Sequence, residues 1–286
     1  MDEKPYKPER KRTLQDKFIS GFNSLRFGLI EPIKLKFARR KYSSLYSNQE
    51  KNPLVTIYIP TYNRGEILIE RSVKSVLEQT YKNFELIIIG DHCTDCTEEL
   101  VSQIDDSRIK FYNLPKRGKR YPDEVENHWL AGPVVAANVA LKMAKGKWIA
   151  RIDDDDIWTP DHIESLLNFA QKNDCEFVSG SYIAQRHGEK IVVDVKEDNP
   201  RIGGTQTWLY RSYLRFFKYN INCWRKNWNR VNDIDLQVRM HQAGVRIGFL
   251  DKIVAYVLPR PGEETIGLDA YKLTNVEKKE HFRFDS

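Results

Sequence analysis

The stretch Lys147-Trp-Ile-Ala-Arg-Ile-Asp-Asp-Asp-Asp-Ile-Trp-Thr-Pro160 decides how the chain is organised. Four consecutive carboxylates, Asp153 to Asp156, follow an apolar run and precede two residues that favour burial. Adjacent ionised carboxylates repel one another, and partial burial raises that cost unless a cation lies among them. In an extended chain, alternation puts Asp153 and Asp155 on one side and Asp154 and Asp156 on the other. The stretch therefore predicts a buried strand that ends in an acidic, cation-binding segment.

Carboxylate oxygens suit Mg²⁺ or Mn²⁺, which proteins hold with one or two carboxylates while phosphate oxygens and water complete the shell. The implied ligands are a metal and a diphosphate. A second interpretation is a solvated acidic turn that starts a helix, with Thr159 as its cap and Pro160 in its first position. The two interpretations are compatible. An EF-hand is excluded, because Ile157 occupies the fifth ligand position and no glycine follows it.

Composition points to a globular protein whose net positive charge is concentrated in its N-terminal arm. The 286 residues are 41% hydrophobic and 12% aromatic, enough for one large α/β domain or two small ones. Residues 1–51 hold 13 Lys and Arg against 6 Asp and Glu, whereas the whole chain carries only +6. No apolar run approaches the roughly 18 residues of a spanning helix, which predicts a cytoplasmic protein. Cys93 and Cys96 have no second pair to complete a zinc site.

The basic arm, residues 11–42, has apolar side chains at helical spacing among Lys and Arg. They are Phe18, Ile19, Phe22, Leu25, Leu29, Ile30, Ile33 and Phe37. This pattern predicts an amphipathic helix that Pro32 kinks or splits, with Phe27 and Leu35 outside the apolar stripe. Three roles remain open for it: peripheral contact with a membrane surface, packing on its own domain, or binding of a partner. Nucleic acid is not expected, because the rest of the chain is close to neutral.

Strands and helices alternate after residue 53, which predicts a mostly parallel sheet. In such sheets ligands bind beyond the carboxyl ends of the strands. Three of these ends carry polar groups: Pro60-Thr-Tyr-Asn-Arg64 after the first strand, Asp91 after the second, and Asp153 to Asp156. We expect them to meet in one crevice.

The pattern changes beyond Cys175 to shorter strands and an aromatic-rich segment, residues 208–228. Aromatic faces can stack on sugar rings, although most such residues are core. Trp224 and Trp228 flank polar residues and are the two candidates for contact with a sugar ring. We expect a basic helical arm and linker at 1–52, two halves of the main domain at 53–175 and 176–258, and a tail at 259–286.

Five ordered motifs resemble the family 2 inverting glycosyltransferases of the GT-A fold. They are Val55-Thr-Ile-Tyr-Ile-Pro-Thr-Tyr-Asn-Arg64, Ser75-Val-Leu-Glu-Gln-Thr-Tyr81, Thr94-Asp-Cys-Thr97, Ala144-Lys-Gly-Lys-Trp-Ile-Ala150 and Asp153 to Pro160. The resemblance covers residues 54–170 well and continues weakly to about 250. It implies a Rossmann-like sheet and a nucleotide-binding half at 53–175 that takes a nucleotide-diphospho-sugar donor, with UDP-sugar favoured. It also implies an acceptor-binding half at 176–258 that takes a glycan or lipid-linked acceptor, with Trp224 and Trp228 on the acceptor side.

The resemblance also implies roles for individual residues. Pro60, Thr61, Tyr62 and Arg64 would line the nucleotide pocket, Asp91 would bond the base, and Asp154 would meet the ribose or sugar. Asp155 would be the main metal ligand, supported by Asp153. Asp233 would be the general base, with Asp235 in reserve, although its spacing alone suggests a helix cap. Arg117, Lys119 or Arg120 could clamp phosphate, but a solvated basic loop fits them equally.

The sequence departs from the family at two places. Gly90-Asp91 replaces the usual two acidic residues, and no histidine lies between Asp251 and Asp269 to complete the metal site. These departures keep open a degenerate domain that binds sugar nucleotide or a protein without turnover. A sugar-nucleotide nucleotidyltransferase is a further alternative, disfavoured because no glycine-rich phosphate loop follows the first strand.

Overall fold

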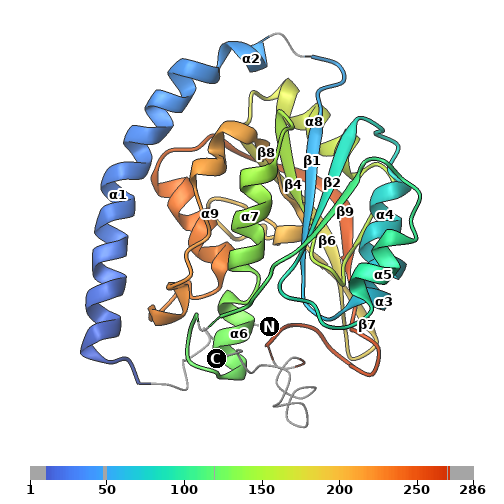
Figure 1. Cartoon of the computed structure of the whole chain (residues 1–286). Coiled ribbons are helices and arrows are strands. Elements are labelled where there is room, and N and C mark those ends of the chain that lie inside the picture. The colour runs from blue at the N-terminus through green and yellow to red at the C-terminus, as the bar shows by residue number, and fades with distance from the viewer. Residues whose placement is uncertain (1–10, 48–49, 119, 269, 271–286) are drawn as a thin grey trace.

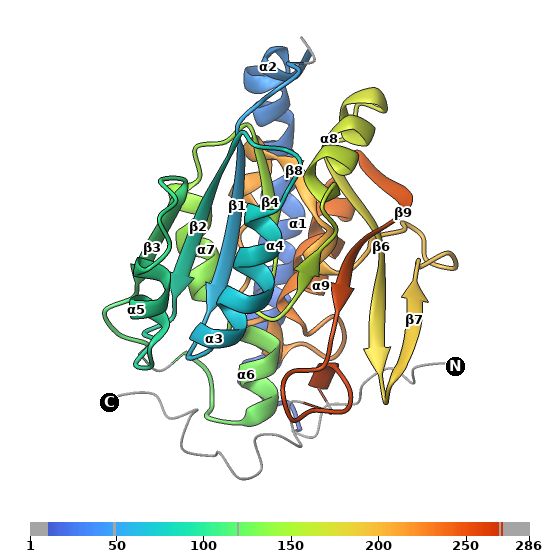
Figure 2. The ribbon, with the colours of Figure 1, turned by 90° about the vertical axis from the view of Figure 1, so that its right-hand side faces the viewer.

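The computed structural model describes residues 11–47, 50–118, 120–268 and 270. Within these residues, nine strands form one mixed sheet in the order β3-β2-β1-β4-β8-β6-β9-β5, with β7 paired to β6. Helices lie on both faces of the sheet (Figure 1), and Figure 2 shows α4 and α8 in front of it with α7 and α9 behind. The expected Rossmann-like α/β architecture is confirmed.

The first half of the sheet is parallel. It contains β1 (Val55–Thr61), β2 (Phe84–Gly90), β3 (Ile109–Asn113) and β4 (Trp148–Arg151), and Val55 lies opposite both Phe84 and Trp148. The helices between these strands are α3 (Gly65–Ile67), the π-helix η1 (Leu68–Val73), α4 (Lys74–Leu77), α5 (Thr97–Ser102), α6 (Val125–Ala131) and α7 (Val134–Met143). Gly132 and Pro133 separate the last two, so this stretch forms two helices.

The second half of the sheet mixes directions. Its elements are β5 (Ile157–Trp158), α8 (His162–Lys172), β6 (Phe177–Arg186), β7 (Glu189–Val193), η2 (Thr205–Thr207), β8 (Leu209–Arg211), η3 (Ser212–Phe216), η4 (Cys223–Arg225), α9 (Asn232–Gln242) and β9 (Ile247–Val257). β8 runs antiparallel to both β4 and β6, whereas β6 and β9 are parallel. The expectation of shorter strands beyond Cys175 is wrong for β6, with 10 residues, and β9, with 11. Asp161, rather than Thr159, occupies the N-cap position of α8.

Two apolar cores lie on opposite faces of the sheet. Tyr58 of β1 points into the core beneath α7, and its neighbours Ile57 and Ile59 point into the core beneath α4 and α8. All seven residues of β1 and of β2 are buried, as expected for parallel strands covered on both faces. The charged residues that directly follow these strands are therefore attached to a rigid support.

The basic arm forms one continuous helix, α1 (Leu14–Tyr42), followed by the short α2 (Ser44–Ser47). Thr13 and Asp16 form a reciprocal capping box at its start. The helix continues through Pro32, so the expected split is wrong. Figure 1 shows α1 along one side of the molecule next to α9. In the described residues, no helix is long and apolar enough to cross a membrane.

Candidate functional site

A cleft of about 1080 Å³ opens at the carboxyl ends of the parallel strands. It brings together every residue that the sequence analysis assigned to the donor, the metal and the principal base: Pro60, Thr61, Tyr62, Arg64, Asp91, Asp153, Asp154, Asp155 and Asp233. Their positions follow from topology, because neighbouring parallel strands end at the same edge of the sheet.

The four aspartates form a tight turn after β4. The backbone N–H of Asp156 bonds the carbonyl of Asp153 at 3.3 Å, and the Ser72 hydroxyl donates to the Asp153 carbonyl at 2.7 Å. Asp154 and Asp156 are buried, while Asp153 and Asp155 are partly exposed to the cleft. Burial raises the pKa of Asp153 and of Asp155, and raises the pKa of Asp156 well above its usual range, with neighbouring carboxylates adding to the effect. The cluster therefore favours a bound cation or proton.

Arg151, the last residue of β4, is a buried counter-charge that the sequence analysis missed. Its Nη2 donates to Asp153 Oδ1 at 2.8 Å, and its Nη1 donates to Asn232 Oδ1 at 3.3 Å. Its guanidinium lies 5.0 Å from the centre of the Tyr219 ring. Arg151 thus ties the acidic turn to the first residue of α9, which carries Asp233.

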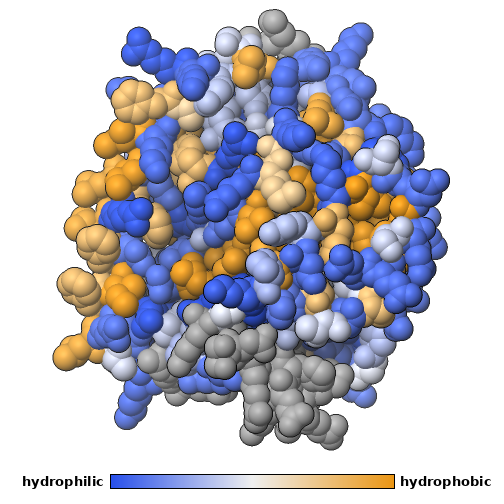
Figure 3. Space-filling view, in the orientation of Figure 1, coloured by the Kyte–Doolittle hydropathy of each residue, from blue (hydrophilic) through white to orange (hydrophobic). Residues whose placement is uncertain are grey.

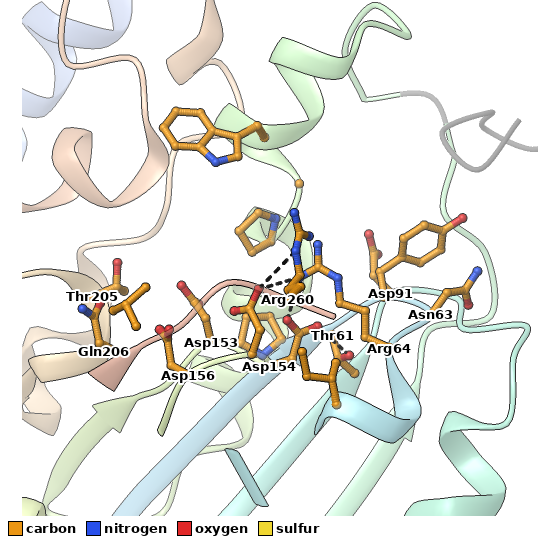
Figure 4. A pocket seen from close by; sticks show the side chains of 18 of the residues that line it. Thr61, Asn63, Arg64, Asp91, Asp153, Asp154, Asp156, Thr205, Gln206 and Arg260 are labelled. Atoms are coloured by element: carbon orange, nitrogen blue, oxygen red, sulfur yellow. Dashed lines mark hydrogen bonds and ion pairs between the residues drawn. The ribbon is translucent and has the colours of Figure 1, made fainter. Parts of the chain in front are cut away.

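Arg64 and Arg260 supply positive charge at the mouth of the acidic turn. Arg64 Nη1 lies 2.8 Å from Asp154 Oδ1 and 3.4 Å from Asp155 Oδ2, and Thr61 Oγ1 also donates to Asp154. Arg260 comes from the loop after β9, in the segment that lacks a histidine, and its Nε is 3.9 Å from Asp155 Oδ2. Figure 4 shows both arginines beside the aspartates, with Asp91 on the far side of Arg64. The sequence analysis did not identify Arg260.

Asp91, at the end of β2, is held by two arginines. Arg117 Nε is 3.0 Å from Asp91 Oδ2, and Arg120 Nη2 is 2.7 Å from Oδ1. The Arg117 guanidinium also stacks 3.8 Å from the centre of the Tyr62 ring. Burial and the nearby guanidinium groups lower the pKa of His128 well below its usual range, so this imidazole is neutral. Lys119, the third proposed phosphate contact, lies outside the described residues.

The candidate base Asp233 sits in the first turn of α9, facing the cleft. Its Oδ2 accepts from the Thr205 hydroxyl at 2.6 Å, and its Oδ1 accepts from the backbone N–H of Ile234 at 2.8 Å. Asp235, the reserve base, is instead fully buried and ion-paired with Lys226 and Arg239. The structure therefore excludes Asp235 from the cleft, because its buried carboxylate is paired with these two cations and does not line the cleft.

The two candidate acceptor-side tryptophans do not line the cleft. Trp224 is 2% exposed and belongs to the apolar core, so the expected acceptor contact is wrong for it. Trp228 is 67% exposed, outside the residues that form the cleft. The tryptophan that does line the cleft, among the described residues, is Trp129 of α6. The sequence did not indicate a cleft position for Trp129, because the residues around it have the pattern of an ordinary helix.

The donor set in the cleft fits a hard divalent cation. Among the described residues, no three His, Cys, Asp or Glu side chains converge into a complete metal shell. Asp153 and Asp155 nevertheless offer two partly exposed carboxylates, which is the usual protein share for Mg²⁺ or Mn²⁺ when phosphate and water supply the other oxygens.

Solved structures with a similar fold support the architecture. TarS 1-349 of S. aureus, solved in complex with UDP-GlcNAc, matches with a TM-score of 0.58 at 20% identity, covering 73% of this chain and 60% of that one. The mannosyltransferase PcManGT from Pyrobaculum calidifontis, solved with GDP-Man and Mn²⁺, matches with a TM-score of 0.55 at 17% identity, covering 84% and 70%. At these identities the likeness shows the shared GT-A type of fold.

Curated relatives include two glucosyltransferases of Escherichia coli that are named for a diphosphoundecaprenol-linked acceptor. UDP-Glc:alpha-D-GlcNAc-diphosphoundecaprenol beta-1,3-glucosyltransferase WfgD is 38% identical over 45% of this chain and 46% of its own length. WfaP, which bears the same enzyme description, is 34% identical over 59% of this chain and 58% of its own length. The chain thus spans about half the length of these relatives. The sequence model of the family described as glycosyl transferase family 2 matches residues 56–121 and 125–231, which is more than half of the sequence. The chain therefore belongs to that family.

Proposed function

We propose that the protein is an inverting glycosyltransferase that moves one sugar from a nucleotide-diphospho-sugar, preferably a UDP-sugar, to a hydroxyl of a glycan or lipid-linked acceptor. The observation that carries this proposal is the meeting of Asp91, Asp155 and Asp233 in one cleft. Family membership and the undecaprenol-linked acceptors named for WfgD and WfaP support it. The setting would be surface polysaccharide or glycoconjugate synthesis at the inner face of the membrane.

The donor would lie across the ends of β1, β2 and β4. Its base would stack near Tyr62 and donate a hydrogen bond to the Asp91 carboxylate, and its ribose would meet Asp154. Its diphosphate would face Arg64 and Arg260, whose guanidinium groups match phosphate oxygens in geometry and charge. Asp153 and Asp155 would hold Mn²⁺ or Mg²⁺, which supplies Lewis-acid stabilisation of the leaving diphosphate.

In the proposed chemical step, the Asp233 carboxylate acts on the acceptor, and the Arg64 and Arg260 guanidinium groups act on the leaving group. The acceptor oxygen forms a bond to the anomeric carbon as the bond from that carbon to the phosphate oxygen breaks. Asp233 takes the hydroxyl proton, and the nucleoside diphosphate leaves with the electron pair, stabilised by Arg64 and Arg260. Attack on the face opposite the leaving group inverts the anomeric centre. The Thr205 hydroxyl and the Ile234 N–H hold the base carboxylate in place.

Calorimetric titration of the protein with UDP, GDP, dTDP and CDP, each with and without Mn²⁺, tests the donor assignment. We expect one nucleotide to bind tightly only when the metal is present. We expect Asp155→Ala to lose this metal-dependent binding. Asp233→Ala should bind the same nucleotide normally and lose transfer to acceptor. Metal-independent binding, or wild-type transfer by both variants, would refute the assignment. Binding with no turnover by the wild type would favour the degenerate domain.

A further inference from the structure

The helix α1 is attached to the domain by the side that carries its two acidic residues. Three ion pairs make the attachment: Asp16 with Arg225, Glu31 with Arg239, and Arg39 with Glu176. Arg39 Nε and Glu176 Oε1 are 2.7 Å apart. Both acidic residues of the helix are buried in these pairs. Phe27 and Leu35, the two apolar residues outside the stripe, also face inward, with Phe27 stacked on Arg239.

The apolar stripe of α1 faces the opposite way, into solvent. Ile19 is half-buried, but the other members of the stripe, together with Leu14, are between 39% and 83% exposed: Leu14, Phe18, Phe22, Leu25, Leu29, Ile30, Ile33 and Phe37. Figure 3 shows hydrophobic side chains along the edge of the molecule that α1 occupies in Figure 1. A soluble helix usually buries such a stripe against its own core. Within the described residues, nothing packs against this one, so it is available to an external apolar phase.

The charges that surround the stripe have a single sign. The exposed charged side chains of α1 are all basic: Lys17, Arg26, Lys34, Lys36, Arg40 and Lys41. The two acids are turned inward, so they do not offset this positive surface. Bulky apolar side chains beside lysines and arginines are the combination by which interfacial helices bind anionic lipids.

We propose that the exposed face of α1 binds the surface of a lipid bilayer that contains anionic headgroups. The helix, 29 residues and roughly 40 Å long, would lie in the plane of the interface with its apolar side chains among the acyl chains. The ion pairs on its other side hold the catalytic domain directly above the lipids. This inference concerns a surface remote from the cleft and stands independently of the proposed reaction.

A second copy of the chain fits this face less well than lipid does. A two-fold dimer would place the same surface of α1 on both partners. The exposed cations of one helix would then meet those of the other, with no exposed acid on either helix to pair with them. Charge complementarity therefore favours an anionic lipid surface over a second copy of the chain as the partner of this face.

Vesicle flotation of the full chain tests the proposal. We expect the protein to float with vesicles of phosphatidylcholine and phosphatidylglycerol, and at least tenfold less with phosphatidylcholine alone. The variant Phe18→Ser, Phe22→Ser, Leu29→Ser should lose at least tenfold in vesicle affinity. It should stay folded, since all three side chains are exposed. A matched control, Ile191→Ser with Val192→Ser, changes exposed apolar residues of β7 and should float like the wild type.

A charge variant separates the two contributions. Replacing Lys34, Lys36 and Arg40 by Gln should remove most of the preference for anionic vesicles and its salt dependence. Equal flotation with both vesicle types, or unchanged flotation of the serine variant, would overturn the proposal. So would a wild-type dimer in sedimentation velocity that the serine variant converts to monomer. Nucleotide titration of the same samples reports the cleft separately, so a failed donor assignment would not be mistaken for failed lipid binding.

Discussion

Replacing Arg239 by Met should weaken the attachment of α1 to α9 and lower the stability of the whole protein. Arg239 donates to Asp235 Oδ2 at 2.8 Å and to the Lys218 carbonyl at 2.5 Å, and it pairs with Glu31. Removing one partner of a buried ion pair commonly costs about 3–5 kcal/mol, because the other charge stays buried without compensation.

The structure limits the cost to about 3 kcal/mol. Asp235 keeps its pair with Lys226. Burial, partly opposed by Arg239, raises the pKa of Glu31 to about 7. At pH 8, protonating Glu31 therefore costs on the order of 1 kcal/mol, which caps its share of the loss. The bonds lost at Asp235 and Lys218 add roughly 1.5 kcal/mol.

Urea unfolding at pH 8, followed by tryptophan fluorescence, measures this loss. The double variant Glu31→Met, Arg239→Met should be about 1 kcal/mol more stable than Arg239→Met alone, because the unpaired carboxyl is gone. At pH 6, Glu31 is already largely protonated in the native protein, so Arg239→Met should cost less there than at pH 8. Arg26→Met, on the exposed side of α1, should stay within about 0.5 kcal/mol of wild type. A double variant less stable than Arg239→Met would refute this reasoning.

Three further perturbations test other parts of the structure. Burial lowers the pKa of His162 to about 3, so the unfolded chain binds its proton first as pH falls; wild type should lose about 2 kcal/mol through this group between pH 7 and 5, and His162→Phe should lack that component in urea titrations. Gly146→Ala would place a Cβ 2.4 Å from a β1 backbone nitrogen and should cost about 2–3 kcal/mol, whereas Gly28→Ala, with open space around it, should be neutral or slightly stabilising in the same assay. Arg151→Lys keeps the charge but loses the forked bonds to Asp153, and calorimetry should show about tenfold weaker metal-dependent nucleotide binding.

Local sequence patterns were sufficient to place the residues of the cleft near one another. Each of Arg64, Asp91 and Asp153 follows an apolar strand, and parallel strands deliver such residues to one edge. The arginines that balance the acids were not predictable in this way. Arg151 reads as one more strand residue, and its partner Asn232 lies 81 positions away. Arg260 lies in a loop whose path depends on β9.

The missed strand β9 has a physical explanation. Asp251 and Lys252 interrupt its apolar pattern, and its register against β6 shifts between Gly180 and Tyr182. A bulge of this kind breaks the two-residue alternation from which strands are predicted.

The helical spacing in the arm predicted a helix correctly but could not say which side would dock. Apolar stripes usually face a core. Here the domain presents buried charges to α1, and the partners of Asp16, Glu31 and Arg39 lie more than 130 positions away. Phe27 and Leu35, which interrupt the stripe, mark the docking side.

These sequence separations set an order of events in folding. The three pairs join residues 209, 208 and 137 positions apart, and the pair of Glu31 with Arg239 can form only after α9 has been synthesised. Contacts this distant form late, because the intervening chain must first be ordered. A helix of 29 residues is long enough to form locally before its partners exist. Complete docking of α1 therefore requires a chain that already extends to α9, which also carries Asp233 of the cleft.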